Sequence, residues 1–293
     1  GGQNINALNG TGGTIDAAGA RTLTLGNGDA TGSFAGVIQG PVSLTKTGAG
    51  TQTLTGVNTY TGTTTISGGK LLFTQAMKNA APVVISNNAI LEVAPNGLAP
   101  GVSKVKSIAI TTDGLGGYAG RFELHDNDLV IDYTGAASPY TTTLDMVRKG
   151  LVLLGGNGKG IGSAEVDAQT LGGTMLAVVD NGAVAGVITA LSGYANIPGQ
   201  AVLVKYTWRG DANLDGVVNG SDYALADTGF TGGGTGWFYG DVNYDGITNG
   251  SDYALLDTGF TSQSGTLPEP GAVGILGMAA CILARRRRNR SPR

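Results

Sequence analysis

The chain has almost none of the residues from which many enzyme sites are built. It contains a single cysteine, Cys281, and a single histidine, His125, in 293 residues. One cysteine excludes an intrachain disulfide, and one histidine nearly excludes metal sites and catalytic triads that depend on histidine. Charged residues make up only 13% and aromatic residues 6% of the chain, and the long amphipathic runs that a helical bundle requires are missing.

Positive charge is scarce outside one place. The formal net charge is −3, yet six arginines lie together at the C-terminal end, at positions 285–288, 290 and 293. The rest of the chain is therefore mildly acidic and has no cluster of basic residues of the kind that binds nucleic acid. We expect no nucleic-acid partner.

Glycine is abundant, with 52 residues, and residues 1–73 contain short runs in which Thr alternates with Leu or Val. One face of each run is apolar, and no run can bury that face alone, whereas stacked coils can. The pattern predicts a mainly β protein with a parallel β-solenoid in this part of the chain; a β-sandwich is the alternative. The runs are residues 22–25, 42–45, 51–54, 63–66 and 70–73.

Residues 44–66 read LTKTGAGTQTLTGVNTYTGTTTI. This pattern, LTKxGxGTxTLxGxNTYTGxTT, resembles the autotransporter-associated β-strand repeat, and the resemblance extends to Phe73. It implies a β-solenoid stalk in a bacterial surface or secreted protein, and it implies no chemistry. We expect the Gly and Asn positions of the pattern to lie in turns that require positive φ.

Beyond residue 73 the sequence divides into four further parts. Residues 74–205 are a β-rich region of unknown role, and 206–260 are a unit duplicated with a 30-residue period. A polar linker, 261–267, separates this unit from an apolar and basic tail, 268–293. A dense acidic cluster at Glu123, Asp126, Asp128 and Asp132 surrounds His125, and we interpret it as polar turn structure rather than as a catalytic site.

Two twelve-residue segments of the duplicated unit, 211–222 and 241–252, share the spacing of an EF-hand-like calcium loop. Oxygen-bearing side chains stand at positions 1, 3, 5, 9 and 12, glycine at position 6 allows a sharp turn, and position 7 supplies a backbone carbonyl. We predict that this module binds two Ca²⁺ ions, that the position 7 side chains face the core, and that the module folds poorly without calcium. The predicted ligands are Asp211, Asn213, Asp215, Val217, Asn219, Asp222, Asp241, Asn243, Asp245, Ile247, Asn249 and Asp252.

A short helix is expected after each loop, over 221–230 and 251–260, closed by its glycine. Loop followed by helix, twice, resembles the type I dockerin module, a family that implies two antiparallel helices held by calcium and a cohesin partner. The chain departs from the family at 227–228 and 257–258, where Asp-Thr replaces the basic residues often found on the recognition face.

The tail begins with Pro-Glu-Pro, continues with 14 mostly apolar residues and ends in a run of arginines. The apolar run is short for a bilayer span, and the arginines would remain on the cytoplasmic side. The arrangement resembles the PEP-CTERM sorting signal, which implies export, transient membrane anchoring through a C-terminal hydrophobic helix, and cleavage. The residues that carry this resemblance are Pro268, Glu269, Pro270, Arg285, Arg286, Arg287 and Arg288.

These features predict an exported cell-surface or extracellular structural or interaction protein, not an enzyme, that binds calcium. A cohesin-like or cell-envelope protein is the expected partner, with a polysaccharide as a further candidate. The alternative is a fragment of an extracellular carbohydrate-active enzyme that degrades polysaccharide, whose catalytic part lies upstream of residue 1 or within 74–205. No catalytic residue is assigned.

Overall fold

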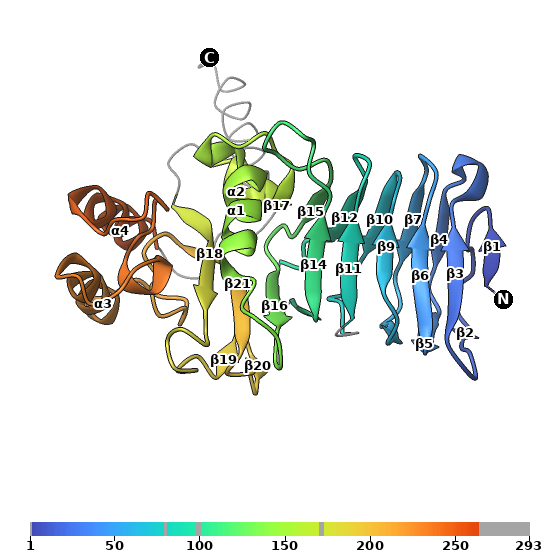
Figure 1. Ribbon diagram of the computed structural model, residues 1–293, viewed down its shortest axis with the longest axis horizontal. Coiled ribbons are helices and arrows are strands. Elements are labelled where there is room, and N and C mark those ends of the chain that lie inside the picture. Colours follow the sequence, from blue (N-terminus) through green and yellow to red (C-terminus); the bar gives the residue numbers. More distant parts are fainter. Residues whose placement is uncertain (1, 79–80, 98–100, 170–172, 264–293) are drawn as a thin grey trace, which may run out of the picture.

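The computed structural model describes residues 2–78, 81–97, 101–169 and 173–263, and most of them wind into a parallel β-solenoid whose coils stack along the long axis of the molecule (Figure 1). Two six-stranded sheets form the main walls, and a three-stranded sheet closes the side between them. The first wall consists of β1 (Gln3–Ile5), β3 (Arg21–Leu25), β6 (Val42–Lys46), β9 (Thr64–Ile66), β11 (Pro82–Ile85) and β14 (Ser107–Ile110). The second wall consists of β4 (Gly32–Phe34), β7 (Thr51–Leu54), β10 (Lys70–Phe73), β12 (Ile90–Val93), β15 (Arg121–Glu123) and β17 (Gly160–Gly162). The third sheet consists of β2 (Thr14–Ile15), β5 (Val37–Gly40) and β8 (Thr59–Tyr60).

Every strand pair in these three sheets is parallel. The predicted solenoid is therefore confirmed, and the β-sandwich alternative, which requires antiparallel sheets, is wrong. Leu44 lies opposite Thr64 and Lys70 lies opposite Ile90, so these coils each take 20 residues. The coils continue beyond residue 73 as far as Gly162, with longer loops between them, which explains why the repeat is not visible there in the sequence.

Alternation along each strand places one residue in two inside the solenoid. In β6 the side chains of Val42, Leu44 and Lys46 are buried, while Ser43 and Thr45 between them are only half-buried. Parallel pairing then stacks equivalent residues from coil to coil, and one such ladder is Leu25, Lys46, Ile66, Ile85 and Ile110. A ladder of this kind buries apolar surface that no single coil could bury.

Lys46 is the exception in this ladder, because it is a charged residue at a fully buried position. Its ammonium donates to the carbonyl oxygens of Thr47 at 2.5 Å, Gly48 at 3.0 Å and Gly68 at 3.3 Å. Burial lowers its pKa, and the charge of Asp29 acts in the opposite direction. The lysine of the repeat pattern therefore ties its own turn to the turn of the next coil.

Two other polar residues of the pattern also join different coils, Gln52 across Gly32 of the intervening coil and Asn58 to the coil before its own. The amide of Gln52 accepts from Leu8 N at 2.9 Å and donates to Leu8 O at 2.8 Å. The amide of Asn58 accepts from Ile38 N at 2.9 Å and donates to Gly56 O at 2.8 Å. Both side chains are buried, and each satisfies backbone groups that would otherwise be left unpaired where the chain turns between sheets.

The glycines of the pattern act mainly through close approach rather than through positive φ. Within residues 44–66, all of them described, only Gly48 has a positive φ, of 64°. A Cβ atom on Gly50, Gly56 or Gly62 would lie within 2.5 Å of a backbone carbonyl oxygen of the preceding coil. The expectation of positive φ at the Gly and Asn positions therefore holds at Gly48 and is wrong at Gly50, Gly56, Asn58 and Gly62. At the three glycines among these, the stacking of coils sets a tighter limit than the turns do.

The C-terminal end of the solenoid is formed by a mixed four-stranded sheet in the order β13 (Val102–Val105), β16 (Asp128–Asp132), β21 (Ala201–Trp208) and β18 (Thr174–Asp180). β21 is antiparallel to both of its neighbours, and it runs across the boundary expected between residues 205 and 206. The remaining elements are η1 (Asn27–Asp29), in the N-terminal coils, and α1 (Tyr140–Gly150), η2 (Val152–Leu154), α2 (Ala164–Asp167), β19 (Ala190–Leu191) and β20 (Tyr194–Ala195).

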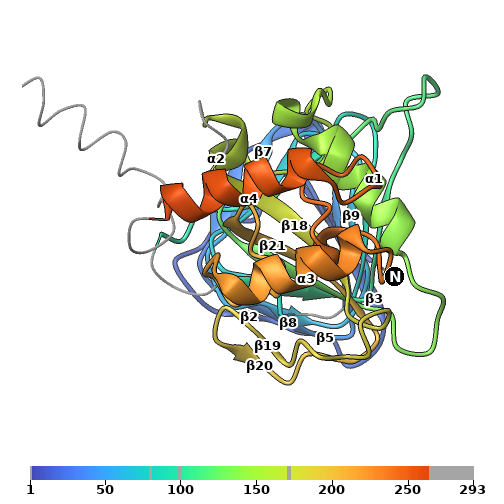
Figure 2. The ribbon, with the colours of Figure 1, turned by 90° about the vertical axis from the view of Figure 1, so that its left-hand side faces the viewer.

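The duplicated unit forms α3 (Gly220–Phe230), η3 (Trp237–Tyr239) and α4 (Gly250–Ser262). Figure 2 shows α3 and α4 side by side across this end of the solenoid, in front of β18 and β21. No helix within the described ranges is long and apolar enough to cross a membrane. The expected C-terminal hydrophobic helix and the sorting residues at 268–270 and 285–288 lie outside the described residues.

Candidate metal centre

The two predicted calcium loops lie at equivalent places, each leading into a helix of the duplicated unit. The first follows β21 and enters α3, and the second follows η3 and enters α4. Their backbones match closely: φ is 63° at both Leu214 and Tyr244, and 95° at both Gly216 and Gly246. A glycine with positive φ at position 6 fits the sharp turn of an EF-hand-like loop.

Asp211 and Asp241 open the two loops, and each has one buried oxygen without a partner. Asp211 is fully buried and Asp241 is 4% exposed. Their Oδ2 atoms accept from the position 6 amides, of Gly216 at 2.9 Å and of Gly246 at 3.1 Å. Their Oδ1 atoms have no hydrogen-bond partner within the part of the chain that the structure describes. A buried carboxylate oxygen without a hydrogen bond destabilises the folded state unless a cation lies beside it.

Asp222 and Asp252 close the loops and hold the backbone in shape. Oδ1 of Asp222 accepts from Ala212 N at 2.8 Å and Asn213 N at 3.2 Å, and Oδ2 accepts from Asn219 N at 2.9 Å. Asp252 repeats the same three contacts in the second loop. Both carboxylates therefore point back from their helices into the loops, as position 12 of a calcium loop requires.

The remaining predicted ligands line the loops between these ends. Asn213 Oδ1 accepts from Asp215 N at 2.9 Å, and Asn243 Oδ1 accepts from Asp245 N at 2.7 Å. Asn219 and Asn249 cap α3 and α4, each accepting from the amide two residues later, so their side-chain oxygens are already engaged. The two halves of the module thus place the same donor set in the same way.

The side chains at position 7 do not face the core as expected. Val217 is 49% and Ile247 is 65% exposed, whereas the next residues, Val218 and Thr248, are buried. That expectation is therefore wrong: the chain turns its position 8 side chain inward instead. The carbonyl of position 7 is the group that a calcium loop uses, and its role does not depend on where the side chain points.

Burial raises the pKa of all four carboxylates at the ends of the loops. It raises the pKa of Asp222 to about 6 and also raises the pKa of Asp211, Asp241 and Asp252. Neighbouring carboxylates in the same loop add to the effect. Negative charges packed together in this way favour a bound cation.

The two helices are tied to each other by reciprocal hydrogen bonds. Tyr223 of α3 donates to Asp257 of α4, and Tyr253 of α4 donates to Asp227 of α3, which makes the helices antiparallel. These aspartates are the residues that depart from the dockerin pattern, so here they hold the helix pair together.

The helices are not closed by glycine as expected. Gly229 and Gly259 lie inside them, where a Cβ atom would come within 2.0 Å of Tyr239 O or 1.7 Å of Arg209 O. Close packing, rather than helix termination, accounts for glycine at these two positions.

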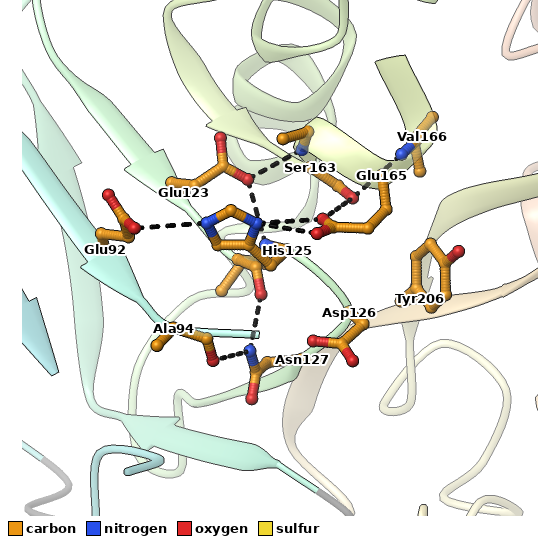
Figure 3. Close-up of polar contacts among 12 residues, drawn as sticks. Glu92, Ala94, Glu123, His125, Asp126, Asn127, Ser163, Glu165, Val166 and Tyr206 are labelled. Atoms are coloured by element: carbon orange, nitrogen blue, oxygen red, sulfur yellow. Dashed lines mark hydrogen bonds and ion pairs between the residues drawn. The ribbon is translucent and has the colours of Figure 1, made fainter. Parts of the chain in front are cut away.

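A second cluster surrounds His125 at the joint between the solenoid and α2 (Figure 3). Nδ1 of the imidazole lies 2.9 Å from Glu165 Oε1 and Nε2 lies 3.3 Å from Glu92 Oε1. Glu123 accepts from the backbone amides of His125 and Ala164. The side-chain atoms of Glu123, His125 and Glu165 that could bind a metal lie within 4.8 Å of one another. The sequence did not reveal this cluster, because Glu92 and Glu165 are far from His125 in the chain.

The His125 cluster is an ion-pair network that is complete without a metal. Burial acts to lower the pKa of His125, but the hydrogen bonds that its ring donates to Glu165 and Glu92 raise it to about 10. Both ring nitrogens face carboxylates, and these hold the imidazole protonated at neutral pH. Lys70 pairs with Glu92 and Arg121 pairs with Glu123, which balances the remaining carboxylates.

The other acidic residues near His125 also have structural partners. Asp126 accepts from the backbone amides of Asn96 and Gly97, and Asp128 accepts from Tyr206 N and Ser192 Oγ. Asp132 pairs with Lys104 at 3.1 Å. These contacts are structural, but of the four acidic residues only Asp126 lies in a turn, because Glu123 ends β15 and β16 begins at Asp128 and ends at Asp132. The interpretation of the whole cluster as turn structure is therefore wrong.

The His125 network should make stability depend on pH, in a way that a variant can isolate. The folded pKa of about 10 lies above the ordinary value of 6.5, so the stabilisation is complete below about pH 6.5 and is lost as pH rises toward about 10. We expect His125→Asn, which tolerates the positive φ of 53° here, to cost about 2 kcal/mol at pH 6. Urea unfolding should show this cost shrinking steadily as the pH rises above 6.5.

The charged groups that face the imidazole are Glu92, Glu123 and Glu165, with Lys70 and Arg121 behind them. Glu92 has its pKa lowered to about 2, chiefly by the hydrogen bond from His125, and its contribution is lost only as pH falls below about 4.5. A cost of the His125→Asn change that stays constant between pH 6 and pH 9 would contradict the network.

Comparison with known proteins adds one finding to this geometry. Residues 44–72 match the family model of the passenger-associated-transport-repeat. No curated protein and no solved structure matches the chain significantly. The matched segment is the one whose Lys46, Gln52 and Asn58 join different coils. A repeat family of autotransporter passenger domains supports an exported surface protein.

Proposed function

We propose that the chain is a structural protein of the cell surface or extracellular space whose solenoid ends in a module that binds two calcium ions. The observation that carries the calcium assignment is the pair of buried, unpartnered oxygens, Oδ1 of Asp211 and Oδ1 of Asp241. They belong to the first ligand position of two loops with the same backbone geometry. Calcium favours carboxylate, amide and carbonyl oxygens, which are the groups that line both loops.

The electrostatics of the loops support the same assignment. Each loop holds three aspartates at positions 1, 5 and 12, and two of the three are buried. Burial raises the pKa of these carboxylates, because a buried loop solvates negative charge poorly. A divalent cation relieves both the repulsion and the unpaired oxygen.

The two sites should differ in affinity, because only the first has a buried ammonium beside it. Lys205 is 3% exposed, and its Nζ lies 3.4 Å from Asp211 Oδ2. The ion pairs of the described residues include none to Asp241. A positive charge near the first loop opposes the entry of a cation, so the second loop should fill first.

Calorimetric calcium titration tests the proposal. We expect two ions to bind in two steps, and we expect Asp211→Asn and Asp241→Asn each to reduce the stoichiometry to one, with Asp241→Asn removing the tighter step. Asp227→Asn changes a carboxylate of the same module outside the loops and should leave two ions bound. A protein that binds no calcium, or that loses neither step in the loop variants, would refute the assignment.

Docking to a protein partner is a second candidate function, in keeping with the dockerin resemblance. Large apolar side chains are exposed at equivalent places in both halves of the module, at Val217 and Ile247 and at Phe230 and Phe260. Exposed apolar side chains that form one contiguous patch mark interaction surfaces, and these four are the candidates for such a patch. Titration of the calcium-loaded protein with a cohesin domain tests it, and absence of binding would count against it.

We also propose that the tail at 268–293 is the sorting and membrane-anchoring segment of the exported protein.

A further inference from the structure

The sheet at the C-terminal end of the solenoid has an edge strand, β18, whose outer edge needs to be covered. β18 is the last strand of the terminal sheet, and among the described residues it pairs with a strand, β21, along only one of its edges. A free edge exposes backbone amides and carbonyls that pair readily with strands of other molecules. Yet six of the seven residues of β18 are buried, so another part of the chain must cover this edge.

Tyr244 covers the middle of that edge. Its hydroxyl donates to Leu176 O at 2.7 Å and accepts from Val178 N at 2.8 Å. The carbonyl of one residue and the amide two residues later are the pair of groups that one residue of an added strand would satisfy. Tyr244 is 2% exposed, and burial raises its pKa well above 10, so the hydroxyl keeps the proton that it donates.

The covering residue is part of the second calcium loop. Tyr244 occupies position 4, between the predicted ligands Asn243 and Asp245, and its φ of 63° turns the side chain away from the ligand positions on either side. Leu214, the equivalent residue of the first loop, is also buried but has no hydroxyl. The conformation that carries Tyr244 to β18 is therefore the conformation that arranges the ligands around an ion.

The first calcium loop is also connected to Tyr244, through the tryptophan of η3. The ring of Trp237 lies 5.4 Å from the ring of Tyr244, and its Nε1 donates to Asp211 O at 2.7 Å. Trp237 is fully buried, and η3, which carries it, contacts β18. The two loops and the edge strand thus share one packed unit.

We propose that the calcium module is the C-terminal cap of the solenoid, and that calcium in the second loop holds Tyr244 against the free edge of β18. The inference rests on the proposed function, because it needs an ion in that loop. Without the ion, Asp241, Asp245 and Asp252 repel one another and the unpartnered oxygen of Asp241 remains buried. Relaxation of the loop then withdraws the tyrosine and opens β18 to solvent and to a second copy of the chain.

Amide hydrogen exchange at Val178, measured with calcium and with EGTA, tests the proposal. In the wild-type protein we expect calcium to slow exchange at Val178 by at least about tenfold, because the tyrosine oxygen closes that amide. Tyr244→Phe should abolish most of the calcium effect at Val178 while two ions still bind in calorimetry. Tyr253→Phe, which removes a hydroxyl from the exposed helix pair, is the matched control and should keep the calcium effect.

The possible outcomes distinguish failure of the cap proposal from failure of the proposal that the module binds calcium. If calorimetry detects no calcium binding, the proposed function fails and the cap proposal fails with it. If two ions bind but exchange at Val178 is the same with calcium and with EGTA, the cap proposal alone is overturned. The wild-type comparison does not depend on a variant, so the test stands even if Tyr244→Phe fails to fold.

Discussion

Removing calcium should unfold the module while most of the solenoid remains folded. A ligand that binds only the folded state stabilises it by about 2.7 kcal/mol per site when its concentration is 100 times the dissociation constant. Two such sites supply ~5 kcal/mol, which is comparable to the whole stability of a small domain. The two helices cannot supply this stability by themselves, because they have 11 and 13 residues and such short helices are marginal alone.

Tryptophan fluorescence is a selective probe of this transition. The chain has two tryptophans, Trp208 at the end of β21 and Trp237 in η3, and both are buried at the base of the module. We expect EGTA to lower the midpoint of thermal unfolding followed by fluorescence by at least ~10 °C. The far-ultraviolet signal of the solenoid strands should change much less.

Two controls bear on the interpretation of the calcium effect. Magnesium at the same concentration should restore little of the loss, because it demands octahedral geometry and dehydrates reluctantly. The Asp211→Asn and Asp241→Asn variants should each show a smaller response to EGTA than the wild type. An identical melting curve with calcium and with EGTA would contradict the calcium assignment.

The sequence predicted those features that depend on residues close together in the chain. The alternation of Thr with Leu in residues 42–54 gave the inward and outward faces of strands correctly, and the Asp-Asn-Asp-Gly spacing located both loops. Pattern and spacing work in these cases because strand pleat and loop geometry are set locally. The solenoid coils after residue 73 escaped notice because loops of different length separate their strands.

Features set by contacts between distant residues were not predictable in the same way. Nothing in the sequence indicates that Tyr244 reaches Leu176, or that Glu92 and Glu165 meet at His125. The glycines of the repeat were misread for the same reason, since the carbonyl that excludes a side chain at Gly56 belongs to Gly36, one coil earlier. The inward position of Lys46 follows from strand alternation, but its three carbonyl partners do not.

Lys46→Met should be among the most damaging single changes in the solenoid. The methionine fits the volume of the lysine stem, so packing in the ladder between Leu25 and Ile66 is retained. The change removes three hydrogen bonds from the ammonium to Thr47 O, Gly48 O and Gly68 O. Bonds to a charged donor contribute ~1.5–3 kcal/mol each, partly offset by the lower cost of burying methionine, so we expect a net loss of about 3 kcal/mol.

The midpoint and slope of urea unfolding, followed by circular dichroism, measure this loss. Lys106→Met is a suitable control, because Lys106 is an exposed lysine that also donates to a carbonyl, Thr134 O at 3.2 Å, and its loss should cost less than ~0.5 kcal/mol. Methionine is more apolar than lysine, so burial alone would make Lys46→Met stabilising. A variant as stable as the wild type would therefore show that the ammonium does not join the coils, and that the lysine of the repeat is kept for some property other than stability.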